Sequence, residues 1–243
     1  MKKVFIDPGH GGKDPGAVGI NGLKEKDIVL SVSLSIGKVL KRHNVEVFYS
    51  RRNDEFIELS ERAKIANTLG VDVFVSVHCN SFSNPQAQGL ETFSHPNSKN
   101  GTALAKCIQD SLLNDKLYTK NRGLKTANFA VLRLTSMTST LVELGFISNV
   151  EDVDILKNKQ KELAESVAKG ILDFLGINYI PLKIEKEDLD NKIKVRIKGK
   201  LHHFDGVFKD KTNYVSIRQV VEALGYKVDW DSKNKEVLIN LRK

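Results

Sequence analysis

Cysteine and long apolar runs are scarce in this sequence of 243 residues. The two cysteines, Cys79 and Cys107, are too few for a small secreted fold held together by disulfides. No uninterrupted apolar run approaches the roughly 20 residues that cross a bilayer, so we expect no membrane span. The apolar stretch at residues 4–6 is too short for a signal-peptide core. We therefore expect synthesis in the cytoplasm without a signal peptide, and release by another route if the substrate lies outside the cell.

Several motifs of common enzyme classes are missing as well. The sequence has no Gly-x-Ser-x-Gly elbow of a serine hydrolase and no His-Glu-x-x-His helix of a metalloprotease. The pair Gly12–Lys13 is followed by Asp14, where a phosphate-binding loop requires Ser or Thr. These absences argue against two hydrolase classes and against nucleotide binding at this loop.

The charge is positive, with a formal net charge of +8 and an isoelectric point near 9.3. Residues 177–243 carry a net charge of +5, and the longer segment 1–176 carries a net charge of +3. The C-terminal segment therefore has the higher positive charge per residue. Nucleic acid, a membrane surface or an acidic wall polymer would each attract such a protein. A lysine-rich surface that serves only solubility explains the same balance.

Apolar patterns of strand type alternate with patterns of helix type along most of the chain. Strands are expected at residues 4–6, 45–49, 71–77, 90–93 and 141–142, and helices at 25–42, 59–69, 103–113 and 152–175. This alternation predicts an α/β fold, in which a mainly parallel twisted sheet carries helices on both faces. Ligand sites of such folds gather outside the carboxyl ends of the strands.

The pattern breaks after residue 176, which predicts a second unit. We expect a catalytic domain at 1–176, a charged linker at 177–191 and a small α+β domain at 192–243. In that domain Ser216, followed by Gln219, has the spacing of a capping box for a helix that ends near residue 224.

Four polar residues stand out because each follows a predicted strand or begins a predicted helix: His10, Glu25, His78 and Glu143. Two imidazoles and a carboxylate can hold zinc, and a further carboxylate can then act on water. The pattern therefore favours a zinc hydrolase. Alternatives remain, because a carboxylate in the first turn of a helix stabilises the helix anyway and a lone histidine at a strand end is usually structural.

The surroundings of two of these positions sharpen the interpretation. Glu143 lies in an apolar segment, where a buried carboxylate is costly unless it is paired or lies beside a cation, and this favours a functional role. Cys79 competes with its neighbour His78 as a ligand, but consecutive strand residues face opposite sides. We expect Cys79 to be a buried, unreactive thiol.

Four segments now resemble the zinc-dependent N-acetylmuramoyl-L-alanine amidases of the amidase 3 type: residues 6–12 (IDPGHGG), 22–27 (GLKEKD), 76–80 (SVHCN) and 142–149 (VELGFISN). The resemblance covers about residues 3–175. It implies zinc held by His10, Glu25 and His78, with Glu143 as the catalytic carboxylate. It also implies cleavage of the amide between N-acetylmuramic acid and L-alanine in peptidoglycan, and we expect Asn80 to contact the substrate.

The C-terminal segments 193–195 (IKV), 214–218 (YVSIR) and 221–226 (VEALGY) resemble a small stalk domain that is named after the N-terminus of copper amine oxidases. The name does not imply copper. We expect this domain to bind a cell-wall polymer, and dimerisation through an exposed sheet edge is the main alternative.

Taken together, these features predict a peptidoglycan hydrolase of the endolysin or autolysin kind, without a nucleic-acid partner. Two other functions remain open. A noncatalytic wall-binding protein would keep the fold but not the turnover. A nucleic-acid binder would act through charge, and its affinity would fall steeply with salt.

Overall fold

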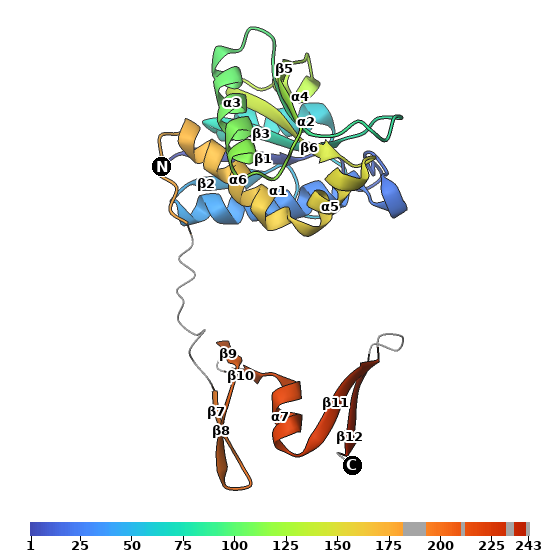
Figure 1. The fold of residues 1–243 in the computed structure, drawn as a ribbon. Coiled ribbons are helices and arrows are strands. Elements are labelled where there is room, and N and C mark those ends of the chain that lie inside the picture. The colour runs from blue at the N-terminus through green and yellow to red at the C-terminus, as the bar shows by residue number, and fades with distance from the viewer. Residues whose placement is uncertain (182–192, 210–211, 232–235, 242–243) are drawn as a thin grey trace. The chain divides into compact units, whose positions relative to one another are not determined.

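The computed structural model describes residues 1–181, 193–209, 212–231 and 236–241. The chain divides into two compact units, Met1–Ile180 and Pro181–Lys243 (Figure 1). Residues 177–180 pack with the first unit, since Tyr179 stacks on His43 and the backbone N–H of Ile180 donates to the same ring. Most of the linker that we expected at 177–191 lies outside the described residues, and the domain boundaries stay a prediction.

A six-stranded sheet forms the centre of the first unit, in the order β2-β1-β3-β6-β4-β5. Its strands are β1 (Lys3–Pro8), β2 (Glu46–Tyr49), β3 (Val73–Asn80), β4 (Leu90–Ser94), β5 (Asn121–Thr126) and β6 (Thr138–Phe146). Neighbouring strands are parallel except β4 and β6, which are antiparallel. The predicted mainly parallel sheet is therefore confirmed.

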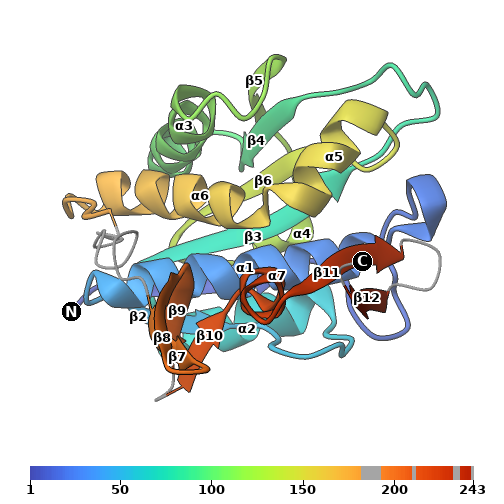
Figure 2. The same cartoon turned by 60° about the horizontal axis from the view of Figure 1, so that its bottom comes forward.

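Helices cover both faces of this sheet, as expected. They are α1 (Glu25–Arg42), α2 (Leu59–Leu69), α3 (Lys99–Asn114), α4 (Ala130–Arg133), α5 (Val150–Asn158) and α6 (Gln160–Phe174). The larger apolar core joins α1, α3, α5 and α6 to one face, and a smaller core joins α2 and α4 to the other. Figure 2 shows α1 and α6 side by side.

Two details of the first unit differ from the prediction. Strand β5 and helix α4 were not expected, and the helix predicted at 152–175 is divided into α5 and α6. The division falls at Lys159, whose backbone leaves the helical region at φ −119° and ψ 27°.

The inner strands β1, β3 and β6 position the polar residues. Residues 73–77 are fully buried, because helices cover the sheet on both sides. Each of these strands runs towards the same edge, where His10 follows β1, His78 lies near the end of β3 and Glu143 lies in β6. The fold thereby brings three of the candidate residues to one edge of the sheet.

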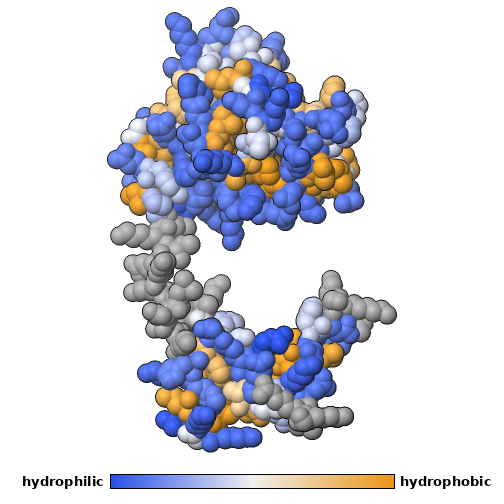
Figure 3. All heavy atoms as spheres, viewed as in Figure 1, coloured by the Kyte–Doolittle hydropathy of each residue, from blue (hydrophilic) through white to orange (hydrophobic). Residues whose placement is uncertain are grey.

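The second unit holds short strands that pair two by two. Its described elements are β7 (Ile193–Ile197), β8 (Lys200–Phe204), β9 (Gly206–Lys209), β10 (Thr212–Val215), α7 (Ile217–Ala223), β11 (Tyr226–Asp231) and β12 (Glu236–Leu241). The helix expected after Ser216 is present as α7, but the side chain of Ser216 does not cap it, so the capping-box prediction was wrong. Gln219 bonds Asp205 instead. Trp230 and Ile239 are exposed, and Figure 3 shows hydrophobic residues on the surface of this unit.

Candidate active site

His10, Glu25 and His78 converge on one point at the carboxyl edge of the sheet. Their ligand atoms all lie within 4.8 Å of one another. The Oε1 atom of Glu25 lies 3.1 Å from Nε2 of His10 and 3.0 Å from Nδ1 of His78. The same oxygen accepts the backbone N–H of Cys79 at 2.9 Å, and Oε2 accepts that of Ala17 at 2.9 Å. The Glu25 carboxylate is thus held rigidly between the two imidazole rings.

The loop after β1 carries His10 in an uncommon backbone conformation, with a φ of 58°. Glycine is required beside it for steric reasons. A Cβ atom at Gly9 would lie 2.3 Å from Cε1 of the His78 ring. Gly9 therefore lets the backbone pass directly against the second imidazole.

Two fully buried arginines donate hydrogen bonds to the backbone of this loop. Arg62 donates to the carbonyl oxygens of Pro8 at 2.6 Å and of His10 at 2.7 Å. Arg51 donates to the carbonyls of Pro8 at 3.1 Å and Gly9 at 2.7 Å. Three consecutive carbonyl oxygens are thereby fixed, which stabilises the left-handed conformation of His10.

Asp14 orients the His10 ring. Its Oδ2 atom is hydrogen-bonded to Nδ1 of His10 at 2.8 Å, which leaves Nε2 facing Glu25. A carboxylate on the second ring nitrogen is the usual support of a metal-binding histidine. Asp14 lies two residues beyond the segment 6–12 that carries the family resemblance, and no role for it was predicted.

The electrostatics of the three converging residues favour positive charge at this point. Burial alone would lower the pKa of His10, but hydrogen bonds and negative charge from Glu25 and Asp14 outweigh it and raise the pKa to about 9. For His78, burial is likewise outweighed by Glu25 and the pKa is raised. The pKa of Glu25 lies well below its usual value despite burial, because both imidazoles bond to it. Two imidazole nitrogens facing one buried carboxylate form a donor set that fits zinc.

Glu143 lies next to this cluster, paired in register with His78 across β3 and β6. Its Oε2 atom is buried and has no hydrogen-bond partner among the described residues. Burial raises the pKa of Glu143 to about 7; His78 opposes this shift, and the charges of Glu25 and Glu91 add to it. A carboxyl group in this state can accept and return a proton near neutral pH.

Asn80 lies two residues beyond His78 on β3. Its side-chain amide donates to Glu91 at 2.5 Å, and its Oδ1 accepts the backbone N–H of Ser81 at 2.8 Å. The residue lines a cavity near Glu143, and its role in substrate binding stays a prediction.

Cavities open on both sides of the converging residues. One of about 290 Å³ is lined by His10, His78, Phe56 and Arg62, among others. Another of about 400 Å³ lies over β4 and β5 and is lined by Asn80, Glu91, Arg122 and Phe146, among others. A long substrate could therefore extend in both directions. No role was predicted for Glu91 or Arg122; Glu91 lies on the predicted strand β4, whereas Arg122 lies on β5, which has no clear strand pattern.

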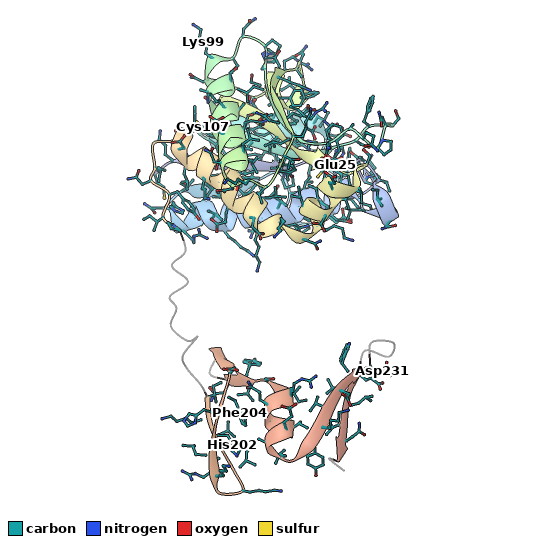
Figure 4. All side chains as sticks on the ribbon, in the orientation of Figure 1. Glu25, Lys99, Cys107, His202, Phe204 and Asp231 are labelled. Atoms are coloured by element: carbon teal, nitrogen blue, oxygen red, sulfur yellow. The ribbon has the colours of Figure 1, made fainter. Side chains whose placement is uncertain are left out.

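Neither cysteine takes part in the cluster. Cys79 is buried in the core, where burial raises the pKa of its thiol well above the usual value, so the expected unreactive thiol fits. Cys107 lies on α3, apart from Glu25 (Figure 4). Only the backbone of Cys79 contributes, through its bond to Glu25.

Comparisons with known proteins agree with this geometry. Residues 4–173 match the family model described as N-acetylmuramoyl-L-alanine amidase. This chain belongs to that amidase family. Residues 196–243 match the model of the copper amine oxidase N-terminal domain, so the second resemblance is also confirmed.

Two curated relatives align with most of this chain. It is 35% identical over 228 residues to the sporulation-specific N-acetylmuramoyl-L-alanine amidase of Bacillus subtilis, a match that covers 93% of this chain and 83% of the relative. It is 39% identical over 186 residues to the endolysin of Bacillus phage SPP1, covering 72% and 67%.

Among solved structures, the amidase resembles N-acetylmuramoyl-L-alanine amidase AmiC2 of Nostoc punctiforme with a TM-score of 0.69 and 41% identity, covering 72% of this chain and 97% of that one. Within the part of the chain that is described, no helix has both the length and the apolar character needed to cross a membrane.

Proposed function

We propose that this enzyme hydrolyses the amide bond between N-acetylmuramic acid and L-alanine in peptidoglycan, with His10, Glu25 and His78 as the ligands of a zinc ion. The observation that carries the proposal is the convergence of these three side chains beside a buried carboxyl group, Glu143, that lacks a hydrogen-bond partner among the described residues. When bound, zinc supplies Lewis-acid chemistry, which polarises a substrate carbonyl and lowers the pKa of water.

Glu143 acts as the proton carrier. Its carboxylate takes a proton from the attacking water and then gives it to the departing nitrogen of L-alanine. A pKa of about 7 suits both transfers, because the group can exist in either protonation state at neutral pH. The pairing of Glu143 with His78 across β3 and β6 supports this role.

Asp14, Arg51 and Arg62 support this chemistry without touching the substrate amide. Asp14 keeps Nε2 of His10 directed at the cluster, and the two arginines hold the carbonyl oxygens of the loop. Because the ligands are fixed before the substrate arrives, little reorganisation is needed during the reaction.

The relatives named as an endolysin and as a sporulation-specific amidase support an action on the cell wall. We propose that the enzyme reaches the wall after release from the cell, as an endolysin or autolysin does. The basic C-terminal unit binds a wall polymer in this proposal. Dimerisation through this unit is the alternative, and sedimentation of the full chain distinguishes the two.

Substitution of Glu143 tests the enzymatic role. Glu143→Gln keeps the size of the side chain but cannot accept the proton, so we expect hydrolysis of purified walls to fall about 10²- to 10⁴-fold. Binding of the variant to walls should equal that of the wild type. Glu162→Gln, on the exposed surface of α6, serves as the matched control and should leave hydrolysis unchanged.

Metal binding is measured separately, by equilibrium dialysis with zinc. The wild type should bind one zinc ion per chain, and His78→Ala should lose it. Stoichiometric zinc in this variant would contradict the ligand set. Wild-type protein that binds walls but never releases alanine amino termini would be the noncatalytic wall-binding protein considered above.

A further inference from the structure

Glu91, which lines the cavity over β4 and β5, belongs to the same row of paired strand residues as Glu143. Across the sheet, His78 pairs in register with Glu143, and Glu143 pairs in register with Glu91. Paired residues of neighbouring strands have side chains on the same face. Glu143 therefore lies between the proposed metal ligands on one side and Glu91 on the other.

Glu91 is 4% exposed at its side chain and is surrounded by polar partners. Asn80 donates to one of its oxygens, and Arg122 and Lys125 contact the other. Arg122 and Lys125 carry two positive charges against the one negative charge of Glu91, so these three side chains have a net charge of +1. The buried Glu91 thus fixes the two basic side chains without cancelling their charge.

Arg122 retains hydrogen-bonding capacity on the cavity side. Its Nε atom donates to Glu91 at 2.7 Å, and its guanidinium lies 4.7 Å from the centre of the Phe146 ring. Nη1 makes only a long contact of 3.5 Å with the carbonyl of Gln88, and Nη2 has no hydrogen-bond partner within the described residues. The side chain is 30% exposed and lines the cavity, so it is available to an anionic ligand.

Among the described residues that line the cavity on the other side of the ligands, no lysine or arginine has a side-chain nitrogen without a hydrogen bond. Arg62 lines it, but each of its three nitrogens already donates to protein oxygens. The remaining charged groups there include Asp7, Asp14 and Glu58, which would repel an anion. An acidic part of the substrate is therefore favoured only on the Arg122 side.

The substrate has one acidic group at the appropriate distance. In the stem peptide, L-alanine is followed by D-glutamate, which is linked through its side-chain carboxyl and keeps a free α-carboxylate, or a carboxamide where the wall is amidated. Two extended residues span roughly 7 Å. Neighbouring strands are about 4.8 Å apart, so Glu91 lies one strand away from Glu143. When the scissile amide lies beside Glu143, the α-carboxylate of D-glutamate therefore comes near Glu91 and the guanidinium of Arg122.

We propose that Arg122 binds the α-carboxylate of the D-glutamate residue in the stem peptide and makes the enzyme selective for walls that are not amidated at this position. The inference rests on the proposed amide hydrolysis. Glu91 is the positioning residue, since it holds the guanidinium by its Nε atom and leaves the outer nitrogens for the substrate.

Two disaccharide peptides that differ only in this carboxylate or carboxamide test the proposal. We expect the wild type to cleave the carboxylate form with about a tenfold or greater advantage in kcat/KM, as a charge-assisted hydrogen bond provides. Arg122→Gln should bring the ratio of the two kcat/KM values close to one. Arg122→Lys should retain part of the preference, because the charge remains.

The ratio of the two substrates does not depend on the fraction of folded enzyme, so partial misfolding of a variant leaves the test intact. Arg133→Gln, an exposed arginine of α4, is the matched control and should keep the wild-type ratio. Equal cleavage of both substrates by the wild type, or an unchanged ratio in Arg122→Gln, would overturn the assignment of Arg122. Failure of the wild type to cleave either substrate would instead overturn the amide hydrolysis, and this inference with it.

Discussion

The pair formed by Arg62 and Asp7 gives the sharpest prediction of stability. Both side chains are almost fully buried, and Nη1 of Arg62 lies 2.8 Å from Oδ1 of Asp7. The guanidinium also donates to the carbonyls of Ile57, Pro8 and His10. Arg62→Met removes these donors and leaves a buried carboxylate without its counter-ion, which costs about 3–5 kcal/mol.

Arg42 provides a matched control on the surface. It contacts Glu165 at 3.0 Å, but both side chains are about a quarter exposed, so Arg42→Met should cost about 0–1 kcal/mol. For a unit of this size each kcal/mol lowers Tm by about 2–4 °C. We therefore expect Arg62→Met to lower Tm by roughly 6–20 °C and Arg42→Met by less than about 4 °C.

Urea unfolding and thermal unfolding, both followed by circular dichroism, measure the free energy of unfolding and the Tm of each variant. Tryptophan fluorescence is unsuitable, because the single tryptophan, Trp230, belongs to the second unit. Asp7→Asn in the Arg62→Met background should recover part of the loss, since it removes the unpaired charge. A difference below about 1 kcal/mol between the two single variants would refute the reasoning about the buried pair.

Two further predictions concern the site and the dependence on pH. Gly9→Ala should weaken zinc binding at least tenfold in calorimetry, because the added Cβ would collide with the His78 ring; Gly70→Ala, where nothing lies within 4 Å, should bind zinc normally. Burial alone would raise the pKa of Glu165, but the hydrogen bonds from Arg42 outweigh it and lower the pKa. Its ionised form thus stabilises the folded state above the unfolded pKa of about 4.3, and this contribution is lost as pH falls through the lower folded value. Glu165→Gln should be less stable than wild type at pH 7 but not at pH 2; an equal deficit at both pH values would contradict the assignment.

Much of the site follows from the sequence because strands and polar residues alternate in a regular way. The strands that precede His10 and His78 are short apolar runs, and a parallel sheet brings their carboxyl ends together. The position of Glu143 was predictable from the cost of burying a carboxylate in an apolar strand. Glu25 was harder, since the first turn of a helix favours a carboxylate for local reasons as well.

The remaining parts depend on contacts between distant segments, which no local pattern records. Arg51 and Arg62 are charged residues, yet they lie fully buried against the loop, because seven oxygens, most of them from distant segments, accept their hydrogen bonds. Strand β5 is polar and largely exposed at an edge of the sheet, so it lacks the apolar alternation that identifies a strand. The role of Arg122 was missed for the same reason.

The central claim is tested most directly by mass spectrometry of purified cell walls after digestion by the full chain. We predict new amino termini of L-alanine and glycan strands with free lactyl carboxyl groups, both abolished by a zinc chelator and restored by added zinc. Walls that dissolve with a different bond cleaved, or that yield the same products at the same rate in the chelator, would contradict the account.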